Sequence, residues 1–414
     1  MQQLPVGVSG PTRYRQSAAP ELVATPTGVE FAWRPDRGHA GHMGDRTERC
    51  AVAATSPTVL VCLHSERQRR QDRRLGAAWA GSARWRQLFM GKTYVVCGAS
   101  GRVGLLVAQH LLAQGHRVRA VTRDPSRLDW LAAQGAQVCG GSIQDPGFLT
   151  EVMRGADAAF VLTPVDTTQQ DVNRVQRRVI DATTTGIRES GVGHVVLLSS
   201  WGAELAEPVG GIIACHWFEE KLNTIDGLNV VHLRPVWFME NFLWNIGLIK
   251  TAGINGSVVA PHTSFPMIAT PDIASVAADY LGSLSFEGRS VRYLNGARDY
   301  TLVEATRILG AAIDRPGLRY SRMPQVVLEK GMVDSGGLTP GAAEFVTEIG
   351  LGISSRLVHA EPRSAANTTP TTLETFAGEV FAPAYHAAPD APLRARVGGA
   401  ALRAMLTAIG RRPV

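Results

Sequence analysis

The sequence is poor in cysteine and has no long apolar run. Its five cysteines are scattered, and no pair has the Cys-x-x-Cys spacing of zinc and redox sites. The sequence therefore predicts neither a disulfide framework nor a metal site. No apolar stretch approaches the ~20 residues that span a bilayer, and no secretory signal follows Met1. These absences favour a reducing, cytoplasmic compartment and predict no membrane segment.

Lysine is absent from residues 1–89, which contain 13 arginines and seven acidic residues. This segment carries the whole net charge of +6, because residues 90–414 hold 29 basic and 29 acidic residues. The basic balance therefore does not indicate a nucleic-acid partner. Only residues 58–63 resemble a strand here, and Met90 directly precedes the first strong strand pattern. We interpret residues 1–89 as a disordered or non-native extension.

Residues 93–104 contain the pattern around which the rest of the chain is organised. An apolar run ending at Cys97 predicts a buried parallel strand. Gly98, Gly101 and Gly104 follow at a spacing of three, and a helical apolar pattern begins at once. Such glycines permit a tight turn, the approach of a ligand to bare backbone, and close packing of helix on strand. Free N–H groups at the helix N-terminus suit a pyrophosphate, so the stretch predicts a dinucleotide-binding unit.

Strand and helix patterns alternate over residues 90–241, which predicts an α/β fold with a doubly wound parallel sheet. We assign this range to the dinucleotide-binding domain. The expected strands are 93–97, 117–121, 137–140, 158–162, 194–199 and 230–233, and later helices cover about 125–134, 146–155, 168–189 and 215–225.

The alternation weakens after residue 242, and we expect a smaller α/β domain over 242–386 that forms the substrate pocket. Asp272 resembles the N-cap of a helix over 273–281, and residues 292–295 resemble a strand. Thr301 and Glu304 have capping-box spacing for a helix to about residue 312.

Residues 387–414 form a basic tail with five arginines and one aspartate. Its apolar residues at helical spacing are Val397, Ala401, Met405 and Ile409. A frayed tail, or a helix docked on the core, is favoured over contact with a membrane.

Five short motifs in order resemble the NmrA-like family of atypical short-chain dehydrogenases/reductases. They are Gly98-Ala99-Ser100-Gly101-Arg102-Val103-Gly104, Val121-Thr122-Arg123-Asp124-Pro125, Leu233-Arg234-Pro235, Phe238-Met239-Glu240-Asn241 and Asp272-Ile273-Ala274. The resemblance covers nearly all of residues 90–386 and none of 1–89. It implies a Rossmann domain that binds NAD(P), with a small C-terminal domain forming the substrate pocket. The residues expected at the cofactor are Gly98, Ser100, Gly101, Arg102, Val103 and Gly104 of the glycine loop, with Thr163 and Pro164 at the ligand edge of the sheet.

Two arginines bear on the choice of cofactor. Arg123 ends the second strand and Arg102 lies within the glycine loop, so both can approach an adenosine 2′-phosphate. Asp124 opposes this interpretation, because a carboxylate there could bind a ribose 2′-hydroxyl. We expect NADP(H) in preference to NAD(H).

Short-chain dehydrogenases use Tyr-x-x-x-Lys, whose spacing of four places both side chains on one helix face. Here Lys221 is retained, but Trp217 occupies the tyrosine place, and indole does not give up its proton near neutral pH. We predict that Lys221 orients the nicotinamide ribose and that Trp217 forms an apolar wall against a planar acceptor. The alternative is that Trp217 is a core residue and Lys221 a surface cation.

Other residues near this helix have two interpretations each. Ser199 and Ser200 stand where the family's active-site serine would lie, or they cap a strand end. His216 could supply a proton, but it lies about 100° off the face of Trp217 and Lys221. Packing is the default interpretation for His216.

Phe238 and Asn241 complete the predicted substrate pocket with Trp217. Two classes of function fit these residues. The first is an NADPH-dependent reductase that transfers a hydride to a small quinone- or dye-like acceptor without the usual tyrosine. The second is a dinucleotide-sensing regulator with no turnover. No nucleic-acid or membrane partner is predicted, and a homodimer is left open.

Overall fold

The computed structural model describes residues 21–25, 28–32, 91–205, 207 and 210–414. The chain divides into two compact units, residues 1–72 and 73–414, and each is described by itself.

In the first unit, β1 (Glu21–Thr25) and β2 (Gly28–Ala32) pair as antiparallel strands. The sequence does not predict them, because residues 1–89 contain no sustained helix or strand period. The strand expected at 58–63 lies outside the described residues, as does most of the proposed extension over 1–89.

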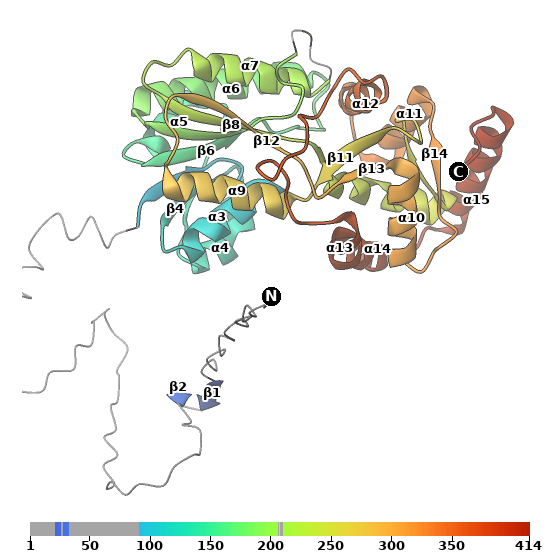
Figure 1. Cartoon of the computed structure of the whole chain (residues 1–414), viewed down its shortest axis with the longest axis horizontal. Coiled ribbons are helices and arrows are strands. Elements are labelled where there is room, and N and C mark those ends of the chain that lie inside the picture. Colours follow the sequence, from blue (N-terminus) through green and yellow to red (C-terminus); the bar gives the residue numbers. More distant parts are fainter. Residues whose placement is uncertain (1–20, 26–27, 33–90, 206, 208–209) are drawn as a thin grey trace, which may run out of the picture. The chain divides into compact units, whose positions relative to one another are not determined.

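Seven parallel strands form the central sheet of the second unit, in the order β12-β8-β7-β6-β3-β4-β5 (Figure 1). From β3 the chain moves outward through β4 and β5, and then returns to β6 on the other side of β3. The predicted doubly wound α/β fold is confirmed, and the order reverses at the carboxyl ends of β3 and β6, where such sheets bind ligands. The strands are β3 (Thr93–Val96), β4 (Arg117–Thr122), β5 (Gln137–Gly140), β6 (Ala158–Leu162), β7 (His194–Leu198), β8 (Asn229–Pro235) and β12 (Arg289–Leu294).

Helices cover both faces of this sheet (Figure 1). Successive residues of β3 point to opposite faces: Tyr94 and Val96 pack in the hydrophobic layer with α3 and α9, and Val95 packs in the layer with α5, α6 and α7. Strands buried on both sides read as continuous apolar runs, which is why the sequence located them well. One face carries α3 (Arg102–Ala113), η1 (Pro125–Leu128), α4 (Asp129–Ala133) and α9 (Thr270–Ser283), and the other carries α5 (Pro146–Met153), α6 (Val172–Ser190) and α7 (Ile212–Asn223).

Two small sheets and a group of helices make up most of the second half of the chain. One sheet pairs β10 (Ile254–Ser257) with β14 (Arg319–Arg322), and the other has the order β13 (Asp299–Thr301), β11 (Ser264–Ile268), β9 (Trp237–Phe238). The helical segments are η2 (Met239–Asn245), α8 (Ile246–Ala252), α10 (Leu302–Ala312), α11 (Gln325–Gly336), α12 (Pro340–Ser354), α13 (Leu373–Phe376), η3 (Ala377–Phe381) and α14 (Ala382–Ala387).

The chain crosses the expected boundary at 241/242 more than once. Both α9 and β12 follow that boundary, yet α9 packs on α3 and β12 pairs with β8 in the central sheet. The N-cap of α9 is Ala269, which corrects the cap predicted at Asp272. The Asp272 carboxylate instead accepts hydrogen bonds from the backbone N–H and the hydroxyl of Thr371. The predicted cap of α10 is confirmed, because the Thr301 hydroxyl accepts from the Glu304 N–H at 3.1 Å.

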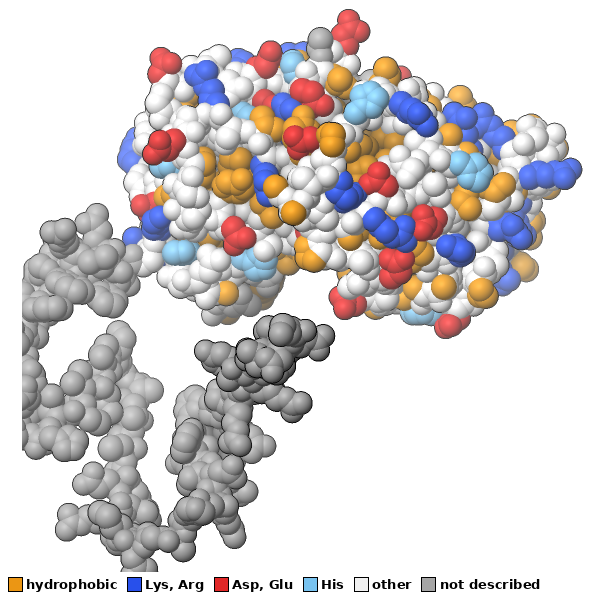
Figure 2. Space-filling view, in the orientation of Figure 1, with side chains coloured by type: hydrophobic (Ala, Val, Ile, Leu, Met, Phe, Trp, Pro, Cys, Tyr) orange, Lys and Arg blue, Asp and Glu red, His pale blue; other side chains and the backbone are white. Residues whose placement is uncertain are grey.

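The tail folds as α15 (Leu393–Ala408), which packs on α8 through the buried Leu406. A helix docked on the core is therefore confirmed, but the buried face differs from the predicted stripe, since Val397, Met405 and Ile409 are exposed. Figure 2 shows Lys and Arg side chains gathered around α15, at the right-hand end of the second unit. Among the described residues, no helix is both long and apolar enough to cross a membrane.

Candidate coenzyme and acceptor site

The three glycines after β3 have the backbone roles that the motif predicts. Gly98 has φ +66°, a left-handed conformation that favours glycine. The Gly101 N–H donates to the Gly98 carbonyl at 2.8 Å and closes a tight turn. A Cβ atom on Gly104 would lie 2.4 Å from the same carbonyl oxygen, so no side chain fits there. The loop and the first turn of α3 are thereby held close together.

The N-terminus of α3 is left open toward this turn. Its N-cap is Gly101, which has no side chain to cap the helix, and the first turn contains no acidic residue. Within the described chain, the backbone N–H groups of Arg102, Val103 and Gly104 have no hydrogen-bond partner. The Ser100 hydroxyl accepts from the Thr122 hydroxyl at 3.2 Å. This arrangement can bind the pyrophosphate of a dinucleotide.

A first cavity of about 240 Å³ opens at the carboxyl edge beside the glycine turn. Arg123 contributes to it from the end of β4, and Pro164 contributes from the segment after β6. Thr163 directly follows β6 but does not line this cavity. The residues that line it are Arg123, Ser142, Ile143, Gln144, Pro164, Val165, Asp166, Thr167, Val175 and Val179. We call it the adenosine cavity, because it lies where the second strand of a Rossmann unit meets the adenosine.

A second cavity of about 260 Å³ lies between η2, β10, β14, α11 and α12, and shares Val165 with the first. Asn241 and Trp237 line this cavity, and Phe238 does not. None of the described residues that line it is charged. We call it the acceptor cavity; its walls include Trp237, Phe242, Trp244, Phe265, Leu328, Met332, Phe345, Val346 and Ile349.

The position of Asn241 in the acceptor cavity is set by its neighbour Glu240. The buried Glu240 carboxylate accepts from the Thr270 N–H at 2.8 Å and from the Thr270 hydroxyl at 2.6 Å, which ties η2 to the start of α9. Asn241 itself has no side-chain hydrogen bond within the described part of the chain. Its amide can therefore donate to a bound molecule.

Trp217 and Lys221 lie side by side on α7, as the spacing of four predicts, but they face α6. The Lys221 Nζ is 3.0 Å from Asp181 Oδ1, and both side chains are more than half exposed. The Arg177 guanidinium lies over the Trp217 ring, 3.3 Å from its centroid. Neither Trp217 nor Lys221 lines the adenosine or the acceptor cavity. The structure does not bring them together with Asn241, and their predicted catalytic roles rest on sequence spacing alone.

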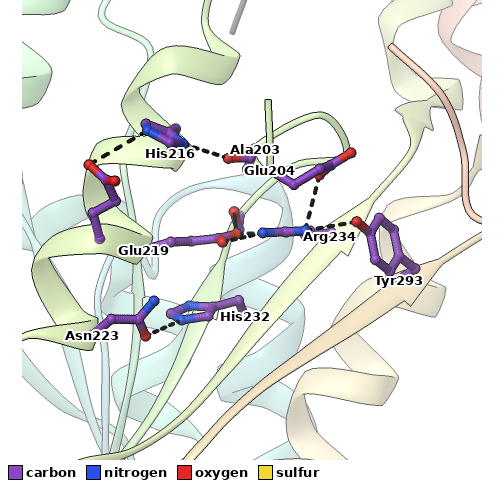
Figure 3. Close-up of polar contacts among 10 residues, drawn as sticks. Ala203, Glu204, His216, Glu219, Asn223, His232, Arg234 and Tyr293 are labelled. Atoms are coloured by element: carbon purple, nitrogen blue, oxygen red, sulfur yellow. Dashed lines mark hydrogen bonds and ion pairs between the residues drawn. The ribbon is translucent and has the colours of Figure 1, made fainter. Parts of the chain in front are cut away.

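A buried charged network that the sequence did not predict lies beneath the carboxyl ends of β7 and β8 (Figure 3). Arg234 donates from Nε to Glu219 Oε1 at 2.9 Å and from Nη2 to Oε2 at 2.5 Å. Its Nη1 reaches Glu204 at 3.0 Å and the Tyr293 hydroxyl at 2.7 Å. Ser199 donates its hydroxyl hydrogen to Glu219. Ser199 thus serves this network, which joins α7 to β7, β8 and β12.

Burial alone would lower the pKa of Arg234, but the hydrogen bonds and charge of Glu219 outweigh it and raise the pKa. The sequence contained one signal for this pair, since Leu233-Arg234-Pro235 places an arginine in an apolar strand. Such a residue needs a buried carboxylate partner.

His216 also contacts protein groups rather than either cavity. Its Nδ1 lies 2.8 Å from the Ala203 carbonyl oxygen, and its Nε2 lies 3.5 Å from the Glu220 carboxylate (Figure 3). The default interpretation as a packing residue therefore accounts for both ring nitrogens.

Comparison with known proteins agrees with this geometry. A family model described as NAD(P)H-binding matches residues 98–283. A (4-alkanoyl-5-oxo-2,5-dihydrofuran-3-yl)methyl phosphate reductase of Streptomyces griseus is 32% identical over 232 residues, which cover 55% of this chain and 76% of the relative.

Solved structures share the fold. An NADPH-dependent quinone oxidoreductase of Escherichia coli, crystallised with NADPH, has a TM-score of 0.58 and 22% identity over 70% of this chain and 99% of its own. NmrA, a negative transcriptional regulator crystallised with NAD, has a TM-score of 0.54 and 15% identity over 72% of this chain and 98% of its own.

Proposed function

We propose that this chain, which belongs to a family of NAD(P)H-binding reductases and has the fold of NmrA-like proteins, reduces a small, uncharged, planar acceptor of the quinone type with NADPH. The observation that carries this proposal is the acceptor cavity, which is apolar, lacks charged lining among the described residues, and meets the adenosine cavity at Val165. An uncharged cavity disfavours ionic dyes, because a charge moved there loses its hydration without gaining a partner.

The coenzyme residues have the roles that the glycine turn supports. The open N–H groups at the start of α3 bind the pyrophosphate, and Arg123 approaches the adenosine 2′-phosphate. The Asp124 carboxylate accepts from the Ser126 N–H at 3.1 Å and from the Ser126 hydroxyl at 2.7 Å, so it caps η1 instead of meeting a ribose. NADPH, when bound, supplies the hydride.

The acceptor cavity supplies position and exclusion of water rather than acid catalysis. Tyr320 is its one tyrosine among the described lining residues, and its buried hydroxyl donates to the carbonyl oxygens of Ser257 and Val259. Among the described lining residues, Asn241 carries an amide whose N–H can donate to an acceptor oxygen as negative charge develops on that oxygen. A quinone spreads that charge over its ring and takes its proton from water, so a tyrosine acid is not required.

Two measurements test the proposal. Purified protein should consume NADPH with neutral quinones, and more slowly with cationic or sulfonated dyes of similar size. Asn241→Leu keeps the volume but removes the donor, and should lower kcat/KM about tenfold, the scale of one neutral hydrogen bond, with NADPH affinity unchanged. Gln134→Leu, which replaces an exposed amide that lines neither cavity, is the matched control and should stay within about twofold. An unchanged kcat/KM in Asn241→Leu would remove Asn241 from the mechanism.

The second candidate function is a dinucleotide-responsive regulator. It is favoured by one observation: among the described residues that line the acceptor cavity, the one acid side chain is Tyr320, whose hydroxyl is already bonded to two backbone carbonyls. Tight coenzyme binding with no NADPH consumption across the whole panel would select the regulator.

A further inference from the structure

An ion pair joins two residues that line the adenosine cavity. The Arg123 Nη1 lies 3.4 Å from Asp166 Oδ2. Arg123 follows β4 and Asp166 follows β6, and these two strands flank β3 on either side. The pair therefore spans the carboxyl end of β3, where the glycine turn begins. A molecule bound in the adenosine cavity would therefore lie beside this pair.

The two partners differ in freedom. Asp166 is held by its own turn, because its Oδ1 accepts from the Thr168 N–H at 3.1 Å and from the Thr168 hydroxyl at 2.6 Å. Its side chain is 19% exposed, whereas that of Arg123 is 74% exposed. The Thr168 hydrogen bonds, together with the charge of Arg123, hold the pKa of Asp166 below its usual range. Asp166 is thus a fixed, ionised carboxylate, and Arg123 is a cation that can turn away from it.

We propose that Asp166 is a specificity-determining residue, from which the 2′-phosphate of NADPH takes over the Arg123 guanidinium. The proposal rests on the proposed use of NADPH. A guanidinium pairs with phosphate at least as well as with a carboxylate, so NADPH replaces the partner that it removes. NADH brings no 2′-phosphate and leaves Arg123 on Asp166. The Asp166 carboxylate therefore reduces the affinity for NADPH and does not change the affinity for NADH.

The size of the effect follows from exposure. An ion pair with one partner largely in solvent contributes at most about fivefold to a binding constant. Asp166→Asn removes the charge but keeps an oxygen that can accept from Thr168, so the turn is retained. The variant should bind NADPH two- to fivefold more tightly and bind NADH unchanged within the error of the titration.

The experiment is a fluorescence titration of each coenzyme at low ionic strength, with no acceptor present. Glu151→Gln is the matched control, because Glu151 forms an exposed pair with Arg154 at 2.7 Å on α5, away from both cavities. The gain in Asp166→Asn should shrink when Arg123→Ala is added, because the exchange needs the guanidinium. Asp166→Ala repeats the test without an amide, and its thermal midpoint reports whether the turn survives.

Three results would overturn the exchange. They are weaker NADPH binding in both Asp166 variants, equal changes for NADPH and NADH, and a gain that is undiminished in the Arg123→Ala background. The last would mean that Asp166 acts on the phosphate by simple repulsion. Since the titrations need no turnover, a failure of the exchange is read separately from a failure of the proposed reductase activity.

Discussion

Replacing Glu219 by glutamine should destabilise the second unit more than any exposed charge change. Glu219 is 5% exposed and Arg234 is 8% exposed, and two hydrogen bonds join them. Glutamine keeps the shape of the side chain but leaves the Arg234 charge with Glu204 alone, whose side chain is 37% exposed. Removing one partner of a buried ion pair costs about 3–5 kcal/mol. With an unfolding entropy of roughly 2.1 cal/mol/K per residue over about 320 residues, the thermal midpoint should fall by about 4–7 °C.

Differential scanning fluorimetry of the full chain measures this change. Glu151→Gln makes the same chemical substitution in an exposed pair and should shift the midpoint by less than about 1.5 °C, since such pairs contribute about 1 kcal/mol or less. Replacing both members, as in Glu219→Leu with Arg234→Met, should recover part of the loss, because no charge is then left buried alone. If Glu219→Gln shifted the midpoint no more than Glu151→Gln, the network would not hold β7, β8 and β12 to α7 as we argue.

The other predictions concern coenzyme and turnover. Gly104→Ala brings a Cβ atom to 2.4 Å from the Gly98 carbonyl oxygen, and the shift that this forces costs about 1–3 kcal/mol. The affinity for NADPH, measured by titration, should therefore fall at least fivefold. Gly378→Ala is the control, since Gly378 has open space around it, and should leave the affinity unchanged. Arg123→Ala should cost NADPH about 1.5–3 kcal/mol of affinity and leave NADH nearly untouched; equal losses would mean that Arg123 does not meet the 2′-phosphate. Lys221→Ala separates two interpretations in a steady-state assay. A catalytic lysine, as the sequence spacing predicts, would cause a marked loss of turnover. We expect a change within about twofold, because Lys221 forms an exposed pair with Asp181.

The central sheet could be predicted closely because its strands are buried on both faces. β5 and β6 begin and end at the residues expected from their apolar runs. The return of the chain to the sheet at β12 could not be predicted in the same way. A strand is expected at 292–295, close to β12, but its place in the central sheet is not, because this edge strand carries Arg289 and Arg292 with partly exposed neighbours and lacks a continuous apolar run.

Within the site, sequence spacing established which residues share a face but not what that face meets. Trp217 and Lys221 do lie one turn apart, yet their surroundings depend on how α7 packs against α6, and that packing brings Arg177 and Asp181 to them. The exchange of Phe238 for Trp237 has a similar cause. Neighbouring residues in β9 point to opposite sides, so one step in register decides which ring reaches the acceptor cavity.

The two cavities are built from different parts of the chain, and the part that matches the family model does not include all of the acceptor cavity. The adenosine cavity is built from residues 123–179, inside the matched range 98–283. The acceptor cavity takes Leu302, Tyr320 and its α11 and α12 walls from beyond that range. Relatives can therefore share the coenzyme site with this chain and still differ in the walls that choose the acceptor. Substitutions in α11 or α12 should accordingly change which acceptor is used. They should leave the coenzyme affinity unchanged, because residues 123–179 build the adenosine cavity.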